Sequence, residues 1–215
     1  FKQKTAYEIM PSLVGSEMCI RDRVMIELFH KDSKLGIIGP RTVYYDFPNE
    51  TAHGAGFVNF WLGKYGEIDA KDPIECDYVI GCCMMIKREV IDKIGGFDRD
   101  YYTSHGEVDF CLRAKKAGFK ILYYPHLVVK HMVSKGGTRT QERLYYLFRN
   151  KIFLIRKNFP FFPKLLSLCL YILFWPSKIL IENIIYNRGI NNKEIKVILK
   201  ALLHGFMGIK GKVKV

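Results

Sequence analysis

FDRDYYTSHGEVDFCLR, residues 97–113, places four acidic side chains among aromatic and apolar ones. A Gly-Gly pair at 95–96 comes before this stretch and favours a turn. After it, apolar residues at 108, 111 and 112 have helical spacing, and Gly118 predicts the end of the helix. Acids at this density beside aromatic residues indicate a polar site on an apolar scaffold. We therefore expect the chemistry of the protein here.

Strand and helix patterns alternate around the acidic stretch. Residues 87–94 predict a helix, because Val90, Ile91 and Ile94 fall on one face before the Gly-Gly pair. Apolar runs of strand length are found at 34–45, 77–86, 119–125 and 127–131. The resulting order of strand, helix, strand, helix, strand predicts an α/β fold.

Three further segments complete the outline. Residues 24–29 predict the end of a helix, and residues 140–158 predict a basic, aromatic helix. Residues 53–73 are rich in glycine and predict either an irregular segment or a hairpin without chemistry of its own. Asp109 and Arg113 are four residues apart, so they are expected to pair along a helix surface, while Asp98 and Asp100 are expected to shape the turn.

The positive charge is concentrated in the C-terminal third. The 215 residues are 49% hydrophobic and 26% charged, which is typical of a globular chain with a core. The net charge is +13, and residues 151–215 hold twelve Lys or Arg against two acidic residues. Such a segment favours an anionic partner, either lipid head groups or nucleic acid. Nucleic acid is disfavoured, because these charges alternate with long apolar stretches and no RNA-binding motif occurs.

The apolar part of this basic tail is short. Residues 165–175 form an eleven-residue run, apolar except for Ser167, that Pro176 interrupts. At about 1.5 Å per residue the run would span roughly 16 Å, against roughly 30 Å for a hydrocarbon core. The preferred interpretation is a pair of interfacial or re-entrant helices with Lys164 and Lys178 at the head groups. Helices packed on the domain or on a partner are the main alternative, and a tilted spanning helix is another.

Residues 1–23 differ in character from the rest. They show neither sustained alternation nor a helical stripe, and they lack the apolar region of a signal peptide. The string resembles translated sequencing-adaptor read-through, so we expect a segment that is not native and a native chain that begins near Val24. The alternative is an ordinary N-terminal strand and helix.

Three residues are candidates for chemistry. Glu107 begins a predicted helix, whose positive end would keep it ionised as a base for a hydroxyl, although it could merely complement the helix dipole. His131 ends a predicted strand and could bind a metal or a phosphate, or simply be exposed or hydrogen-bonded. Gly81 lies inside a predicted strand, which indicates either the close approach of a ligand or a bulge.

Residues 77–158 resemble the C-terminal half of family 2 glycosyltransferases, particularly the bacterial rhamnosyltransferase-like members. The matching pieces in this sequence are LGIIGPRTVYY, DYVIGCCMMIKREV, GGFDRDYY, GEVDFCLRAKKAGF, ILYYP, VVKH and RLYYLFRNKIFLIRKNFP. The resemblance implies the C-terminal portion of a GT-A domain, over residues 24–158, followed by amphipathic membrane-associated helices in residues 159–215. The nucleotide-binding half of the family, with its metal-binding aspartate motif, has no counterpart in the sequence.

The resemblance also implies a mechanism. Such enzymes move a sugar from a nucleotide-sugar donor to an acceptor hydroxyl with inversion, and they use a divalent metal, Mg²⁺ or Mn²⁺. The usual Glu-Asp pair of the family falls on Gly106-Glu107, so Glu107 takes the position of the base. It is one methylene longer than the common Asp, and a misplacement near 1 Å can cost roughly a hundredfold in rate. His131 falls on a late His that binds metal or diphosphate, and Asp77 and Gly81 fall on the strand beside the acceptor site.

The expected function is therefore part of an inverting glycosyltransferase of cell-surface polysaccharide synthesis. The acceptor is expected to be a glycan or a lipid-linked sugar, and the location the cytoplasmic face of a bacterial-type cell membrane, as a peripheral or interfacial protein. We expect that this polypeptide does not catalyse sugar transfer on its own. Two alternatives are a non-enzymatic module that binds anions or nucleic acid, and an inactive remnant.

Overall fold

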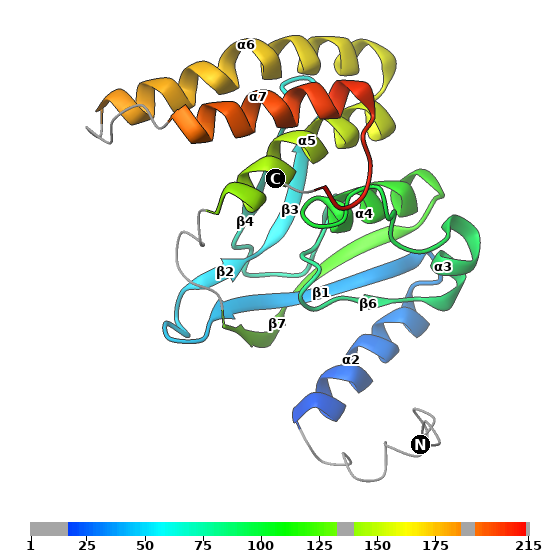
Figure 1. Ribbon diagram of the computed structural model, residues 1–215. Helices are drawn as coiled ribbons and strands as arrows, with labels where there is room; N and C mark the ends of the chain where they lie inside the picture. Colours follow the sequence, from blue (N-terminus) through cyan, green and yellow to red (C-terminus); the bar gives the residue numbers. More distant parts are fainter. Residues whose placement is uncertain (1–16, 133–139, 186–191, 214–215) are drawn as a thin grey trace, which may run out of the picture.

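A mixed sheet forms the centre of the protein. The computed structural model describes residues 17–132, 140–185 and 192–213 (Figure 1). The two longest strands, β1 (Leu35–Tyr44) and β7 (Lys120–His131), run parallel in the middle of the sheet. Shorter antiparallel strands border them: β2 (Thr51–His53) and β6 (Met85–Ile86) pair with β1, and β5 (Ile74–Glu75) pairs with β7. Helices cover both faces of the sheet, so the α/β prediction is confirmed.

One face of the sheet is covered by α2 (Glu17–Lys31). Its residue Met25 is buried in a small cluster with Leu35, Ile38 and Leu127 of the sheet. The prediction that residues 24–29 belong to the end of a helix is confirmed, since α2 ends at Lys31. Because α2 begins at Glu17, it includes the last residues of the segment expected to be foreign, whereas residues 1–16 lie outside the described part.

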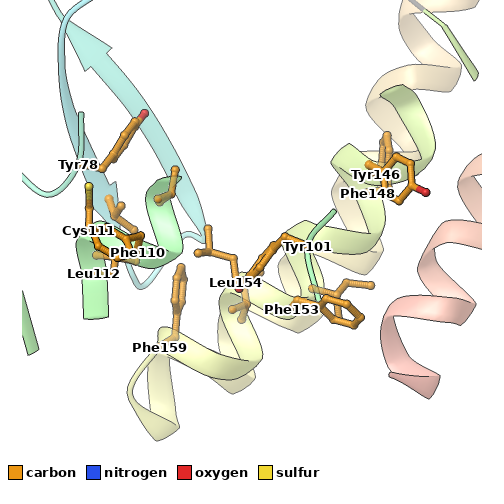
Figure 2. Close-up of a cluster of buried hydrophobic side chains, with 14 of the residues drawn as sticks. Tyr78, Tyr101, Phe110, Cys111, Leu112, Tyr146, Phe148, Phe153, Leu154 and Phe159 are labelled. Atoms are coloured by element: carbon orange, nitrogen blue, oxygen red, sulfur yellow. The ribbon is translucent and has the colours of Figure 1, made fainter. Parts of the chain in front are cut away.

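The main core lies on the other face. There α3 (Arg88–Ile94), α4 (Gly106–Lys116) and α5 (Gln141–Asn158) confirm the helices expected from the sequence. Thr140 caps α5, since its hydroxyl accepts from the Arg143 N–H at 3.1 Å. Figure 2 shows side chains of α4 and α5 meeting in this core, with Phe110 on one side and Leu154 on the other. The burial of this shared apolar surface is what holds α5 against the α/β domain.

Two C-terminal helices, α6 (Phe161–Ile185) and α7 (Asn192–Met207), lie over α5 (Figure 1). Ala201 of α7 is fully buried, and Gly205 lets the helix approach so closely that an added Cβ would lie 2.7 Å from Ile152 of α5. The alternative prediction, that the C-terminal helices pack on the domain, is therefore confirmed. Pro176 interrupts the apolar run in the sequence but not the helix, because α6 continues past it; a helical proline removes one hydrogen bond but does not always stop a helix. Among the described residues no helix combines the length and apolarity needed to cross a membrane.

Two predicted strands differ from the observed ones. Residues 77–86 are not one strand: Tyr78 makes a single bridge to Gly56, residues 81–82 turn, and only Met85 and Ile86 pair with β1. The apolar run instead packs over the sheet, with Val79 against Gly39 of β1. The two strands expected in 119–131 are joined in β7, where a bulge at residues 125–127 interrupts the pairing with β1.

The hairpin alternative for residues 53–73 is confirmed. Strands β3 (Ala55–Asn59) and β4 (Lys64–Ile68) form a two-stranded antiparallel sheet. Its turn reaches α6, where the Ser167 hydroxyl donates to the Phe60 carbonyl at 2.5 Å. The hairpin thus connects the sheet to the C-terminal helices.

The close contact at Gly39 gives a test of this packing. A Cβ added there would lie 2.5 Å from the Val79 Cβ, whereas a Cβ added at Gly66 would have no heavy atom within 4 Å. We expect Gly39→Ala to lower the free energy of unfolding by about 1–3 kcal/mol, as overpacking does. Gly66→Ala is the matched control and should change it by less than about 0.5 kcal/mol. Urea unfolding of the two variants checks this, and equal midpoints would show that residues 77–86 do not cover β1 as described.

Candidate functional site

The loop before α4 has an unusual backbone. Tyr102, Ser104 and His105 have φ values of 60°, 60° and 68°, in the left-handed region that side chains other than glycine seldom adopt. Each such residue costs free energy and persists only where surrounding contacts enforce it. At the start of the loop, the Asp98 carboxylate accepts from the Asp100 N–H at 2.9 Å, which confirms its predicted role in the turn.

Two buried side chains of α5 hold this loop. Asn150 donates from its amide nitrogen to the carbonyls of Tyr101 and Ser104 at 2.8 and 3.0 Å. Arg149 donates to the carbonyls of Asp100 and Tyr101 at 3.0 and 3.1 Å. Both side chains are fully buried. These bonds supply donors to loop carbonyls that belong to no helix or strand ladder, and the Tyr101 carbonyl also accepts from the Thr103 N–H at 2.7 Å.

The C-terminal segment closes onto the same place. The Gly211 N–H donates to the Asp100 carbonyl at 2.9 Å, and Arg149 donates to the Gly211 carbonyl at 2.7 Å. The Asp100 carboxylate pairs with Lys157 at 2.7 Å and with Lys210 at 3.0 Å. Burial raises the pKa of Asp100, but the hydrogen bonds from both lysines outweigh it and lower the pKa overall. The loop is thus fixed from α5 and from the end of the chain.

Asp109 differs from its predicted place on a helix surface. Its pairing with Arg113 is confirmed, with the Arg113 Nε 2.8 Å from the carboxylate. The Asp109 side chain is only 1% exposed, however, because α5 packs over this part of α4. There it also accepts from the Tyr101 hydroxyl at 3.1 Å and from the Asn158 amide at 2.6 Å. Asp109 therefore joins the loop, α4 and α5 from inside the core.

Glu107 emerges from the first turn of α4, two residues after this loop. It is half-buried and faces Gly81, where an added Cβ would lie 3.4 Å from the Glu107 Cβ. Burial raises the pKa of Glu107, and the charge of Glu67 adds to this. Its own backbone N–H and the nearby His53 lower it, without reversing the direction. The expected stabilisation of its charge by the helix end is outweighed by burial, so Glu107 binds a proton more tightly than a free glutamate.

His131 joins this region through two residues from separate strands. At the end of β7, its ring lies 5.9 Å from the ring of His53 on β2. The His53 Nδ1 is 3.1 Å from a carboxylate oxygen of Glu67 on β4. We call His53, Glu67, Glu107 and His131 the acidic site, because His53 contacts both His131 and Glu67, and the charges of His53 and Glu67 both affect the pKa of Glu107.

A second group of polar side chains adjoins the acidic site. The Tyr65 hydroxyl is 2.8 Å from the Nε2 of His105, which is buried. Lys151 of α5 places its Nζ 3.9 Å from the centre of the Tyr65 ring. Burial lowers the pKa of His105 to about 3, helped by the charge of Lys151, and lowers the pKa of Lys151 to about 7. Burial and the charge of Glu107 raise the pKa of Tyr65, whose hydroxyl contacts His105 two residues before Glu107.

Asp77 is occupied by the packing of the fold. One of its carboxylate oxygens accepts from Lys115 of α4 at 2.7 Å, and the other accepts from the Val58 N–H of β3 at 2.8 Å. Gly81 therefore lies beside Glu107, His131 is linked to the acidic site through His53, and Asp77 belongs to the junction of β3 and α4. A role for Asp77 beside an acceptor stays a prediction.

His131 and His53 are the candidate metal ligands of the acidic site. The His131 Nδ1 is buried and has no hydrogen-bond partner among the described residues, so it could serve as one ligand. The His53 Nδ1 is engaged by Glu67. Within residues 17–132, 140–185 and 192–213, no three His, Cys, Asp or Glu side chains are grouped to hold a metal ion. The described donor set does not fit a complete metal site.

Several site residues were missed from the sequence. His53, Tyr65 and Glu67 lie in the segment that was expected to carry no chemistry of its own. Alternation along β4 was the available signal, since Tyr65 and Glu67 are two residues apart and must share one face of the strand. Lys151 and His105 gave no comparable signal, because their burial depends on contacts between distant segments.

The curled mixed sheet and the helices around it are consistent with an α/β domain of the glycosyltransferase-like class. No family model matches the chain. A low-salt glycan biosynthesis hexosyltransferase of Haloferax volcanii, Agl10, is 27% identical over 194 residues, which cover 85% of this chain and 61% of the relative. The dTDP-rhamnosyl transferase RfbF of Shigella flexneri is 24% identical over 109 residues, 46% of this chain and 36% of that protein.

A third relative matches a shorter region. The N-acetylglucosaminyl-diphospho-decaprenol L-rhamnosyltransferase of Mycobacterium tuberculosis is 31% identical over 75 residues, 34% of this chain and 24% of the relative. The chain thus spans less than two thirds of each of these relatives. Their names confirm, at low identity, the predicted resemblance to glycosyltransferases of the hexosyl- and rhamnosyltransferase kind. The assignment to family 2, and the status of residues 1–23, stay predictions.

The carbonyl contacts of Asn150 give a test of how the loop is held. We expect Asn150→Ala to lower the free energy of unfolding by about 1–3 kcal/mol, the cost of an unpaired polar group, because the Ser104 carbonyl loses its donor while Arg149 still donates to the Tyr101 carbonyl. We also expect faster hydrogen exchange in residues 100–107. Arg156→Ala is the control, because Arg156 likewise donates to two carbonyls, of Gly205 and Phe206, but at α7. If both variants changed exchange in residues 100–107 equally, Asn150 would not be the specific support of the loop.

Proposed function

We propose that this chain carries the acceptor-side part of an inverting glycosyltransferase, with Glu107 as the base. The observation that carries the proposal is the setting of Glu107: a half-buried carboxylate with a raised pKa at the start of α4, opposite the bare backbone of Gly81. A general base works best when its pKa lies near the working pH, and burial moves a glutamate in that direction. The similarity to hexosyl- and rhamnosyltransferases supports the same reaction class.

In the proposed reaction the acceptor hydroxyl lies at the Glu107 carboxylate, beside Gly81. Glu107 takes the hydroxyl proton while the oxygen forms a bond to the anomeric carbon of the donor sugar. The bond from that carbon to the diphosphate breaks on the opposite side, so the nucleoside diphosphate leaves with the electron pair and the configuration inverts. The loop fixed by Asn150 and Arg149 holds the start of α4, and with it the carboxylate, in place.

A divalent metal, Mg²⁺ or Mn²⁺, belongs to the proposal as the partner of the diphosphate. His131 would offer one ligand through its unpartnered Nδ1, or would bind the diphosphate directly. Because the described residues hold no complete metal site, we propose that donor binding needs residues beyond them. The 61% coverage of the hexosyltransferase relative agrees with this. In this proposal the 215-residue chain shows no turnover by itself.

The base role can be tested in a chain that includes the upstream coding sequence, with a panel of nucleotide sugars and sugar-diphospholipid acceptors. We expect Glu107→Gln to reduce transfer by about a hundredfold to ten-thousandfold, as loss of a general base does. In the unaltered enzyme the rate should fall with decreasing pH along a limb that lies above 4.5, the ordinary pKa of glutamate, because the pKa of Glu107 is raised. Turnover by the 215-residue chain alone would contradict the need for further residues.

Two controls separate chemistry from folding. Glu89→Gln changes an exposed glutamate that also begins a helix, α3, and should leave the rate unchanged. Glu107→Gln should melt no lower than the parent at pH 7, because it removes a carboxylate whose ionised form burial disfavours in the folded state. That difference should vanish below pH 4.5, where both states hold the proton. A normal rate in Glu107→Gln would exclude this residue as the base.

We also propose that the C-terminal helices bring the protein to the cytoplasmic face of a bacterial-type membrane, as a peripheral protein of cell-surface polysaccharide synthesis. Each helix leaves large apolar side chains exposed, such as Leu165 on α6 and Leu203 on α7, with exposed fractions of 57% and 58%. The basic tail would contact anionic head groups while these side chains enter the interface. A glycan or lipid-linked acceptor would be met at this surface.

Flotation with anionic liposomes at low salt tests the membrane proposal. We expect the chain to float, and Leu203→Glu to weaken partitioning roughly tenfold or more, since it removes an apolar contact and adds a repelled charge. Ile26→Glu is the matched control: Ile26 is also exposed, on α2 away from the tail, and its substitution should have no effect. A chain that stays unbound, or two variants that behave alike, would refute the proposal.

A further inference from the structure

An apolar pocket lies between the β3–β4 hairpin and the start of α6. Its volume is about 890 Å³, within the range of small-molecule sites. Its walls are mainly aromatic, with Phe57, Phe60, Trp61, Tyr65 and Phe162 among the lining residues. The pocket is therefore built for an apolar occupant.

The pocket offers little to a sugar or a nucleotide base. Apart from Lys64 and Tyr65, the polar side chain in the lining is that of Asn59. Its side-chain oxygen Oδ1 already accepts from the Leu62 N–H at 3.0 Å. Sugars and bases are recognised by several well-placed hydrogen-bonding groups. An occupant that is mostly hydrocarbon fits this lining better.

One end of the pocket meets the acidic site. Tyr65 lines the pocket, and its hydroxyl contacts His105 at 2.8 Å, two residues before Glu107. Tyr65 also shares one face of β4 with Glu67, two residues further along the strand. A molecule that fills the pocket would thus have one end beside the proposed base.

Two lysines lie near this end of the pocket. Lys64 lines the pocket and is exposed, whereas Lys151 lies over the Tyr65 ring at 3.9 Å and is only 5% exposed. Lys151 has no carboxylate partner among the described residues. A buried lysine without a counter-ion is costly and favours an anionic ligand nearby. The occupant is therefore expected to carry negative charge at the end that meets Tyr65.

The other side of the pocket continues into the exposed apolar surface. Phe162 lines the pocket and is 72% exposed at the start of α6, next to Phe161 and one turn before Leu165. Trp61 and Leu62 are exposed at the tip of the hairpin. An apolar chain could pass along this surface from the proposed membrane face into the pocket.

We propose that this pocket binds the first part of the isoprenoid chain of a lipid-linked acceptor, with its diphosphate beside Lys64 and Lys151 and its sugar toward Glu107. The identity of the acceptor rests on the proposed function, and the diphospho-decaprenol in the name of the mycobacterial relative is a molecule of this kind. The occupant combines a hydrocarbon chain and an anionic head, as the lining and the lysines require. Residues of the pocket would thereby select acceptors by their lipid.

Binding of farnesyl diphosphate to the 215-residue chain tests the proposal without requiring turnover. Equilibrium dialysis should show saturable binding that the exposed-wall variants Trp61→Ala and Phe162→Ala each weaken by about tenfold. Ile26→Ala, an exposed apolar change on α2, should leave it unchanged. Lys151→Met should weaken farnesyl diphosphate severalfold while farnesol binding stays constant, because it removes the charge and keeps most of the volume.

The possible outcomes are distinct. Failure of farnesyl diphosphate to bind, or equal binding by the wall variants and the parent, overturns the pocket assignment. Competition by inorganic diphosphate as strong as by farnesyl diphosphate also overturns it, since the chain would then recognise the anion alone. Wall-dependent binding by a protein whose extended form transfers no sugar would support the pocket and reject the proposed function. Sugar transfer to acceptors, without lipid binding that depends on the wall residues, would support the proposed function and reject the pocket assignment.

Discussion

The hydrogen bonds from Asn150 and Arg149 to the loop carbonyls are the constraint on which the site depends. Three loop residues with side chains adopt left-handed backbone angles, a conformation that is unfavourable without outside support. Asn150 and Arg149 provide it from inside the core, at carbonyls that no strand or helix pairs. Because α4 begins directly after this loop, its first turn and Glu107 take their direction from α5. A helix outside the central sheet thus fixes the carboxylate at the sheet edge.

The acidic site also depends on elements far apart in the sequence. His53 comes from β2 and His131 from the end of β7 of the main sheet, whereas Glu67 comes from β4 of the separate two-stranded sheet, so the packing of the two sheets brings these side chains together. Asp77 supports this arrangement indirectly, because its carboxylate joins β3 to α4. The hairpin then links the acidic site to the C-terminal helices through Ser167.

Local pattern predicted a large part of the fold. The helices α3, α4 and α5, the buried strand β1 and the pairing of Asp109 with Arg113 follow from periodicity and short spacings, and all are confirmed. The run 77–86 has the composition of a strand, but Gly39 lets Val79 pack across the sheet, a contact that local pattern does not contain. The burial of Asp109 and the contact of His53 with Glu67 could not be predicted from local pattern either, because both depend on the packing of distant segments.

The contact between Gly211 and Asp100 changes how the end of the chain should be regarded. The segment after α7 is bonded to the same loop carbonyl region that Arg149 supports, so it takes part in a single cooperative unit with the loop. Ordering of the loop and docking of α7 must then favour each other to the same extent, whichever occurs first. The residues after α7 therefore help to hold the loop before α4 in place.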